Sequence, residues 1–130
     1  MAFRLYSTDD GHVPAWEYYE CSAMVPKVGL CMAFNADGQL EASATPAFIC
    51  MREEGVAVEA GTKIPVVRIA PDQIWESVLA TNSPNVKLGD TADVSTTCEW
   101  VKATGMTNNN LEITYLDGVV MDSVVRVRFK

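Results

Sequence analysis

Three neighbouring side chains near the N-terminus are the first candidates for chemistry in this sequence. Asp9, Asp10 and His12 could each supply a ligand to a metal ion. Three adjacent ligands cannot fill a coordination shell without a second cluster, and the segment 7–11 is rich in turn-forming Ser, Thr, Asp and Gly. We therefore expect a solvated loop here rather than a metal site, and the sequence predicts no cofactor.

A hydrolytic site is the second possibility, and the residues for it are scattered. A serine or cysteine nucleophile needs a base within reach, but His12 is the only histidine. The acidic pairs Asp9-Asp10 and Glu53-Glu54 could supply the two carboxylates of a glycosidase. Both pairs stand next to glycines in turn-like segments, where a solvated charge is the ordinary explanation. No glycine-rich phosphate loop is present, and we expect a protein that is not an enzyme.

The four cysteines are more consistent with packing than with chemistry. Cys21, Cys31, Cys50 and Cys98 contain no C-x-x-C pair, and each is flanked by strand-like residues. A structural zinc site would need paired spacing and usually histidine. We expect these side chains to be small buried hydrophobes.

Length and charge narrow the class of protein. The 130 residues suffice for one domain with a sizeable core. The net charge of −7, without a basic stripe, argues against nucleic-acid binding. No apolar run is long enough to cross a bilayer and the N-terminus lacks a secretory signal, so we expect no membrane contact and a cytosol-like compartment.

The elements that would position any site are short strands. Residues 64–69 are apolar on both alternating faces, and Asp37-Gly38 separates two strand-like runs as in a hairpin. Residues 71–80 predict one helical turn followed by a strand. About ten such runs at regular spacing predict an all-β fold, a compact β-barrel or β-sandwich.

The chain divides into an arm and a domain, and the domain has two similar parts. Residues 1–15 predict an N-terminal arm and loop, and residues 16–130 a single all-β domain. Within it, Lys27-Val28-Gly29 is echoed by Lys87-Leu88-Gly89, and Val66-Val67-Arg68-Ile69 by Val124-Val125-Arg126-Val127. These echoes favour half-repeats at 26–70 and 86–128, although chance matches among so many valines are an alternative.

The large aromatic residues leave two interpretations open. Three tryptophans and several tyrosines could form a platform for a sugar, but such residues are more often core or interface material. The candidates are Trp16, Trp75, Trp100, Tyr18, Tyr19 and Tyr115. A carbohydrate- or small-ligand-binding β-sandwich is therefore an alternative function.

A resemblance to a known family adds to these patterns. The run Val25-Pro26-Lys27-Val28-Gly29, the hairpin at Asp37-Gly38, the segment 40–44, the 61–69 strand with its Pro-Val-Val core and the closing Val-Arg-Val-Arg-Phe carry it. Together they resemble the small head decoration, or capsid cement, proteins of tailed bacteriophages and prophages. The resemblance covers about residues 25–130 and implies a β-rich module without a catalytic site that binds the outside of an assembled shell. The aromatic segment 16–19 and the extra cysteines depart from the family pattern.

The resulting expectation is a structural protein of the virion, made in the bacterial host cytoplasm. Its expected partner is the major capsid protein, and it is expected to form a homo-oligomer. The basic end of an otherwise acidic chain could pair with an acidic neighbour, although solvated charges on an edge strand explain it equally well. The predicted partner-binding residues are Phe3, Arg4, Trp16, Tyr18, Arg126, Arg128 and Lys130.

Overall fold

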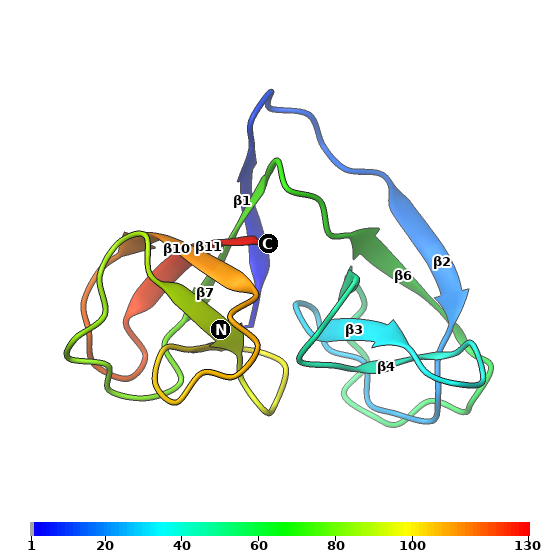
Figure 1. The fold of residues 1–130 in the computed structure, drawn as a ribbon. Coiled ribbons are helices and arrows are strands. Elements are labelled where there is room, and N and C mark those ends of the chain that lie inside the picture. Colours follow the sequence, from blue (N-terminus) through cyan, green and yellow to red (C-terminus); the bar gives the residue numbers. More distant parts are fainter. Residues whose placement is uncertain (1) are drawn as a thin grey trace.

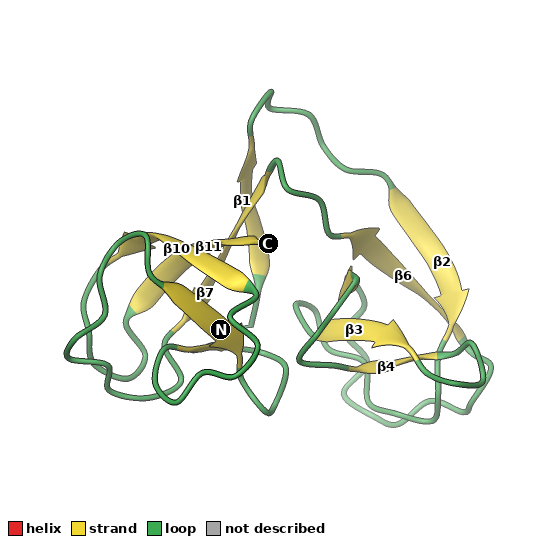
Figure 2. Ribbon diagram, viewed as in Figure 1, coloured by secondary structure: helices red, strands yellow, loops and turns green. Residues whose placement is uncertain are grey.

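The computed structural model describes residues 2–130, and these residues form strands joined by turns (Figure 2). One sheet has the order β1-β7-β11-β10-β8-β9. Its strands are β1 (Arg4–Thr8), β7 (Gln73–Val78), β11 (Val124–Phe129), β10 (Leu111–Leu116), β8 (Thr91–Val94) and β9 (Val101–Lys102). The other has the order β2-β6-β5-β3-β4. Its strands are β2 (Trp16–Glu20), β6 (Lys63–Arg68), β5 (Phe48–Cys50), β3 (Cys31–Phe34) and β4 (Leu40–Ala42).

The all-β prediction is confirmed. Every strand pair within the two sheets is antiparallel, and the sheets pack against each other without closing into a barrel in residues 2–130. This arrangement matches the sandwich among the two predicted alternatives. The part of the chain that the structure describes holds no helix that could pass through a bilayer.

One apolar core joins both sheets. Trp75 and Phe48, one from each sheet, are among its largest fully buried side chains, and burying such a side chain is worth about 1.5–3 kcal/mol. In β11, Val125, Val127 and Phe129 are buried while the alternate residues are partly exposed, as the sequence pattern predicts. All four cysteines are free and buried, which confirms their expected role as small hydrophobes.

The two sheets repeat one plan of five strands. When β1 is set aside, β2 to β6 correspond in chain order to β7 to β11, and both sheets arrange the five in the same spatial order. The two groups lie side by side in Figure 1. The hydrogen bonds correspond as well, since Gly29 N–H donates to the Cys50 carbonyl and Gly89 N–H to the Ile113 carbonyl, each at 2.8 Å.

Of the two sequence echoes, one matches this structural repeat and the other does not. Gly29 and Gly89 stand at equivalent places before β3 and β8, with φ of +91° and +88°. The echo of residues 66–69 in residues 124–127 does not agree with the hydrogen bonds that the two halves share. Ile69 N–H donates to Ala47 in one half and Lys130 N–H to Asn110 in the other. That correspondence aligns Val66 with Val127 rather than with Val124.

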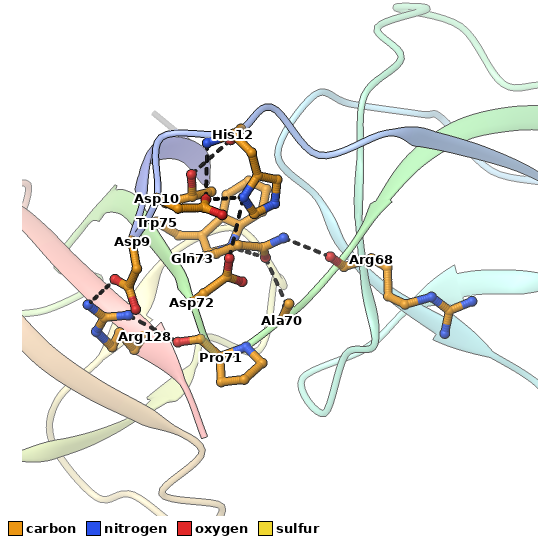
Figure 3. Close-up of polar contacts among 11 residues, drawn as sticks. Asp9, Asp10, His12, Arg68, Ala70, Pro71, Asp72, Gln73, Trp75 and Arg128 are labelled. Atoms are coloured by element: carbon orange, nitrogen blue, oxygen red, sulfur yellow. Dashed lines mark hydrogen bonds and ion pairs between the residues drawn. The ribbon is translucent and has the colours of Figure 1, made fainter.

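The connection between the halves is held by one buried glutamine (Figure 3). The Gln73 side chain accepts from Ala70 N–H at 2.9 Å and from Trp75 Nε1–H at 3.0 Å, and donates to the Arg68 carbonyl at 3.0 Å. Residues 71–72 form a turn and β7 starts at Gln73, so the predicted helical turn is wrong. A side chain that satisfies the backbone of the turn replaces the hydrogen bonds that a helix would supply.

The N-terminal segment, described from residue 2, crosses to the far half of the chain. β1 pairs with β7, so a strand that precedes the first sheet in sequence forms the edge of the second. Phe3, just before β1, is 1% exposed, and its ring lies 5.7 Å from that of Phe129. The sequence places Phe3 on a contact surface, but it is a core residue, because its ring packs against Phe129 within the apolar core.

Candidate partner-binding surface

A row of polar and aromatic residues runs across four strands on the outer face of the six-stranded sheet. Arg4 of β1 is opposite Glu76 of β7, Glu76 is opposite Arg126 of β11, and Arg126 is opposite Tyr115 of β10. The inward neighbours in these strands, including Trp75 and the apolar positions of β11, belong to the core. Because successive side chains of a strand point to opposite faces of the sheet, the row lies on the face that points away from the core.

Glu76 is the electrostatic centre of this row. It is only 4% exposed and accepts Arg4 Nε–H at 2.9 Å and Arg126 Nε–H at 2.9 Å. The hydrogen bonds from Arg4 and then Arg126 lower the pKa of the Glu76 carboxyl and outweigh its burial. One buried carboxylate therefore fixes two guanidinium groups, and the row keeps an excess positive charge.

Two β-bulges bring tyrosines against Arg126. The β1–β7 register shifts between Leu5 and Ser7, which leaves Tyr6 unpaired, and the β10–β11 register shifts just before Tyr115. Bulges re-aim side chains. Here the Arg126 guanidinium lies 3.7 Å from the Tyr6 ring centroid and 4.2 Å from that of Tyr115, while the two rings remain 52% and 37% exposed. We call Arg4, Tyr6, Glu76, Tyr115 and Arg126 the Arg126 face.

The other two basic residues at the chain end, Arg128 and Lys130, lie outside the Arg126 face. Arg128 donates to Asp9 Oδ1 at 2.8 Å and to the Pro71 carbonyl at 3.0 Å (Figure 3). Lys130 is exposed. Of the three basic residues predicted at the end of the chain, only Arg126 joins the Arg126 face.

Trp16 and Tyr18 lie apart from this face, on β2 of the other sheet. Their side chains are 52% and 60% exposed. Among residues 2–130, β2 is the last strand of its sheet and pairs there with β6 alone. Of the seven predicted contact residues, Arg4 and Arg126 therefore lie on the Arg126 face and Trp16 and Tyr18 on the β2 edge, whereas Phe3 is in the core and Arg128 and Lys130 belong to neither surface.

The predicted loop at the N-terminus gains an acidic neighbour from a distant turn (Figure 3). The Asp10 carboxylate contacts His12 Nδ1, which lies 3.6 Å from Asp72 Oδ2. The hydrogen bond to Asp10 raises the pKa of the exposed His12 imidazole. Asp9 turns away to Arg128. Asp10, His12 and Asp72 offer three possible ligand atoms for a cation within 4.8 Å of one another.

The second acidic pair stabilises its turn. Glu53 Oε2 accepts the Val28 N–H at 2.8 Å, and Glu54 pairs with Arg52. Both carboxylates thus have partners within the protein, whereas free solvated charges were the expectation for this turn.

The tryptophans do not share a platform. Trp75 is fully buried, with its indole N–H bonded to Gln73, and Trp100 is half-buried. Trp16 is the tryptophan with more than half of its surface open. A sugar-binding site built from all three rings is excluded by the burial of Trp75.

Sequence reasoning missed Glu76, Tyr6 and Asp72. No local pattern indicates Tyr6 or Asp72, and all three acquire their roles from residues far along the chain: Arg4 and Glu76, for example, are 72 positions apart. A glutamate within an otherwise buried strand pattern was the single available signal for Glu76. No family model matches this chain, and no curated protein matches it in sequence.

Proposed function

We propose that this chain is a structural protein of a tailed-bacteriophage virion that binds the outer surface of the assembled head as a homo-oligomer. The observation that carries the proposal is the Arg126 face, an ordered and solvent-facing set of aromatic and basic side chains on a sheet of an all-β protein. The sequence resemblance to head decoration proteins supports the same proposal. The major capsid protein is the proposed partner.

The Arg126 face suits recognition because its side chains are ordered before a partner arrives. Arginine and tyrosine are enriched where protein interfaces bind most strongly. Arg126 is held by Glu76 and two rings, so little rotamer freedom remains to be lost on binding. The excess positive charge of the row fits an acidic patch on the shell.

A ligand-binding β-sandwich is the second candidate. The exposed rings of Trp16 and Tyr18 are the observation in its favour. Glycan binding that is lost in Trp16→Ala would support it. Trp75→Ala is unsuitable as a test, because removing a fully buried indole destabilises the fold.

Co-sedimentation with purified heads that lack this protein tests the leading proposal. The wild-type protein should sediment with the heads. The double variant Tyr6→Ala/Tyr115→Ala should bind about 30-fold more weakly, the effect of losing about 2 kcal/mol of interface energy. Val120→Ala, which shortens a side chain 60% exposed outside the Arg126 face, is the matched control and should bind as wild type. Failure of the wild type to sediment, or equal binding by the double variant, would refute the proposal.

A further inference from the structure

The outer edge of β2 is open within residues 2–130, whereas the equivalent edge in the second half is covered. In the second half, the strand that corresponds to β2 is β7, and its outer edge is covered by β1. In the first half, no strand within residues 2–130 pairs with the outer edge of β2. The internal repeat therefore shows that this edge can take one more antiparallel strand.

The backbone groups that face this edge can be assigned. Cys21, just after β2, donates its N–H to Thr62 at 2.9 Å, on the side of β6. Hydrogen-bonding direction alternates along an antiparallel strand, so Glu20, Tyr18 and Trp16 direct their N–H and C=O groups to the open edge. In β7 the backbone N–H and C=O groups of Glu76 correspondingly face β1, where Glu76 is opposite Arg4.

The β2 edge carries little protection against strand pairing. Proteins commonly guard an edge with charged side chains, lysine above all, with proline or with a bulge. β2 contains no proline or lysine, its register with β6 is unbroken over five pairs, and of its two glutamates Glu17 is already paired with Arg68. Trp16 and Tyr18 place large exposed rings beside the open backbone groups.

The sequence of β2 is complementary to itself. In an antiparallel pair centred on Tyr18, Tyr18 faces Tyr18 of the second copy, Trp16 faces Glu20, and Glu17 faces Tyr19. No glutamate faces a glutamate. Glu17 is further neutralised within its own chain by Arg68, whose Nη2 lies 2.9 Å from Glu17 Oε1. Repulsion between the two acidic copies is screened over distances beyond about 8 Å at physiological salt.

We infer that the occupant of this edge is a second copy of the chain. Two β2 strands pair about a two-fold axis at Tyr18, which joins the two five-stranded sheets into one continuous sheet. In this dimer Trp16 and Tyr18 gain Glu20 and Tyr18 of the second copy as cross-strand neighbours, which covers part of their surface, and the outward N–H and C=O groups of Trp16, Tyr18 and Glu20 become paired. The inference names a self-association surface and does not depend on binding to a capsid.

Sedimentation velocity of the purified chain, over a concentration series, tests the dimer with two substitutions at one position. Tyr18→Pro removes the outward N–H and should leave the β6 ladder intact, since proline is tolerated on an edge strand. Tyr18→Thr removes the ring but keeps the N–H. The wild type should sediment as a dimer of the 14.2 kDa chain. Tyr18→Thr should dimerise within about tenfold of wild-type affinity, and Tyr18→Pro should weaken dimerisation at least about 100-fold.

Amide hydrogen exchange of the wild type provides a readout that does not depend on the folding of Tyr18→Pro. The amides of Trp16, Tyr18 and Glu20 should be protected at concentrations where the dimer forms, and should exchange faster on dilution to monomer. A wild-type monomer throughout the concentration series, or a dimer in which these three amides remain unprotected, would overturn the inference. A monomer in solution would also remove the homo-oligomer from the proposed function, but neither result decides whether the chain co-sediments with heads, so failure to dimerise and failure to bind heads are distinguishable.

Discussion

Gly61 and Asp122 occupy equivalent positions in the two halves and share a left-handed backbone. Their φ angles are +92° and +69°. Gly61 N–H donates to the Cys21 carbonyl at 2.9 Å, and Asp122 N–H donates to the Leu79 carbonyl at 3.0 Å. The same tight turn is thus built once with glycine, which adopts this conformation without strain, and once with aspartate, which does so at a cost.

Replacing Asp122 with glycine should therefore stabilise the protein. Relief of left-handed strain outweighs the extra freedom of glycine in the unfolded chain, and we expect a gain of about 0.5 kcal/mol. Gly61→Ala should cost about 1 kcal/mol, because a Cβ there meets only ordinary contacts and the backbone strain alone remains. Urea unfolding measures both changes. A loss of stability in Asp122→Gly would contradict this account of the turn.

Gly29 and Gly89 should respond very differently to the same substitution. Both have positive φ, so alanine strains either turn by about 1 kcal/mol. At Gly29 the new Cβ would also lie 2.3 Å from the Phe3 carbonyl oxygen, whereas at Gly89 it meets nothing within 4 Å. Gly29→Ala should displace Phe3 from the core and cost about 3 kcal/mol or more.

Thermal or urea unfolding of the two alanine variants separates these effects. If Gly29→Ala and Gly89→Ala lower the free energy of unfolding equally, the contact of the new Cβ with Phe3 does not affect stability, which would contradict this prediction. A double variant with Phe3→Ala provides a further check. Its cost should be smaller than the sum of the two single losses, because both substitutions remove the same packing of Phe3.

Glu76 should make stability sensitive to acid. Its folded-state pKa is lowered by Arg4 and Arg126. The stability gained from its ionised form is therefore fully present above its unfolded-state pKa and is lost as pH falls through the lower folded-state pKa. Glu76→Gln should cost about 1–3 kcal/mol at pH 7, since it leaves two guanidinium groups without their carboxylate.

The acid dependence itself is the sharper measurement. As the pH falls below about 4.5, the free energy of unfolding should fall less steeply in Glu76→Gln than in wild type. Glu41→Gln, at an exposed position of β4, is the matched control and should follow the wild-type curve closely. Parallel acid curves for wild type and Glu76→Gln would contradict the assigned role of Glu76.

His12 should titrate above its ordinary range. Its pKa is raised from 6.5, chiefly by the hydrogen bond to Asp10. As the single histidine, it gives an unambiguous NMR signal. Asp10→Asn should bring the pKa down, and Asp72→Asn should lower it less, because Asp72 Oδ2 is 3.6 Å away. The folded-state pKa is higher than the unfolded-state value of about 6.5. Any contribution of this contact to stability is therefore fully present below about pH 6.5 and is lost as the pH rises through the folded-state pKa. Titration of wild-type His12 at or below 6.5 would refute the contact.

The local patterns that succeeded concern which face of a strand is buried and where it turns. Asp37-Gly38 indicates the hairpin, and β3 and β4 pair around it with Phe34 opposite Leu40. The predicted helical turn failed because Gln73, rather than a helical ladder, satisfies the backbone at the start of β7. The helix propensity of a few residues does not predict that a buried side chain will form hydrogen bonds with the backbone of the turn.

The all-β class, the inward face of β11 and the burial of the cysteines follow from local sequence patterns, because alternation and turn chemistry act between neighbours. Three features arise only when the whole chain folds: β1 pairs with β7, Glu76 binds both Arg4 and Arg126, and the two halves share one strand order. The physical reason is that strand pairing is a long-range choice. Many partners satisfy the same backbone hydrogen bonds, and only the packing of the whole core selects among them.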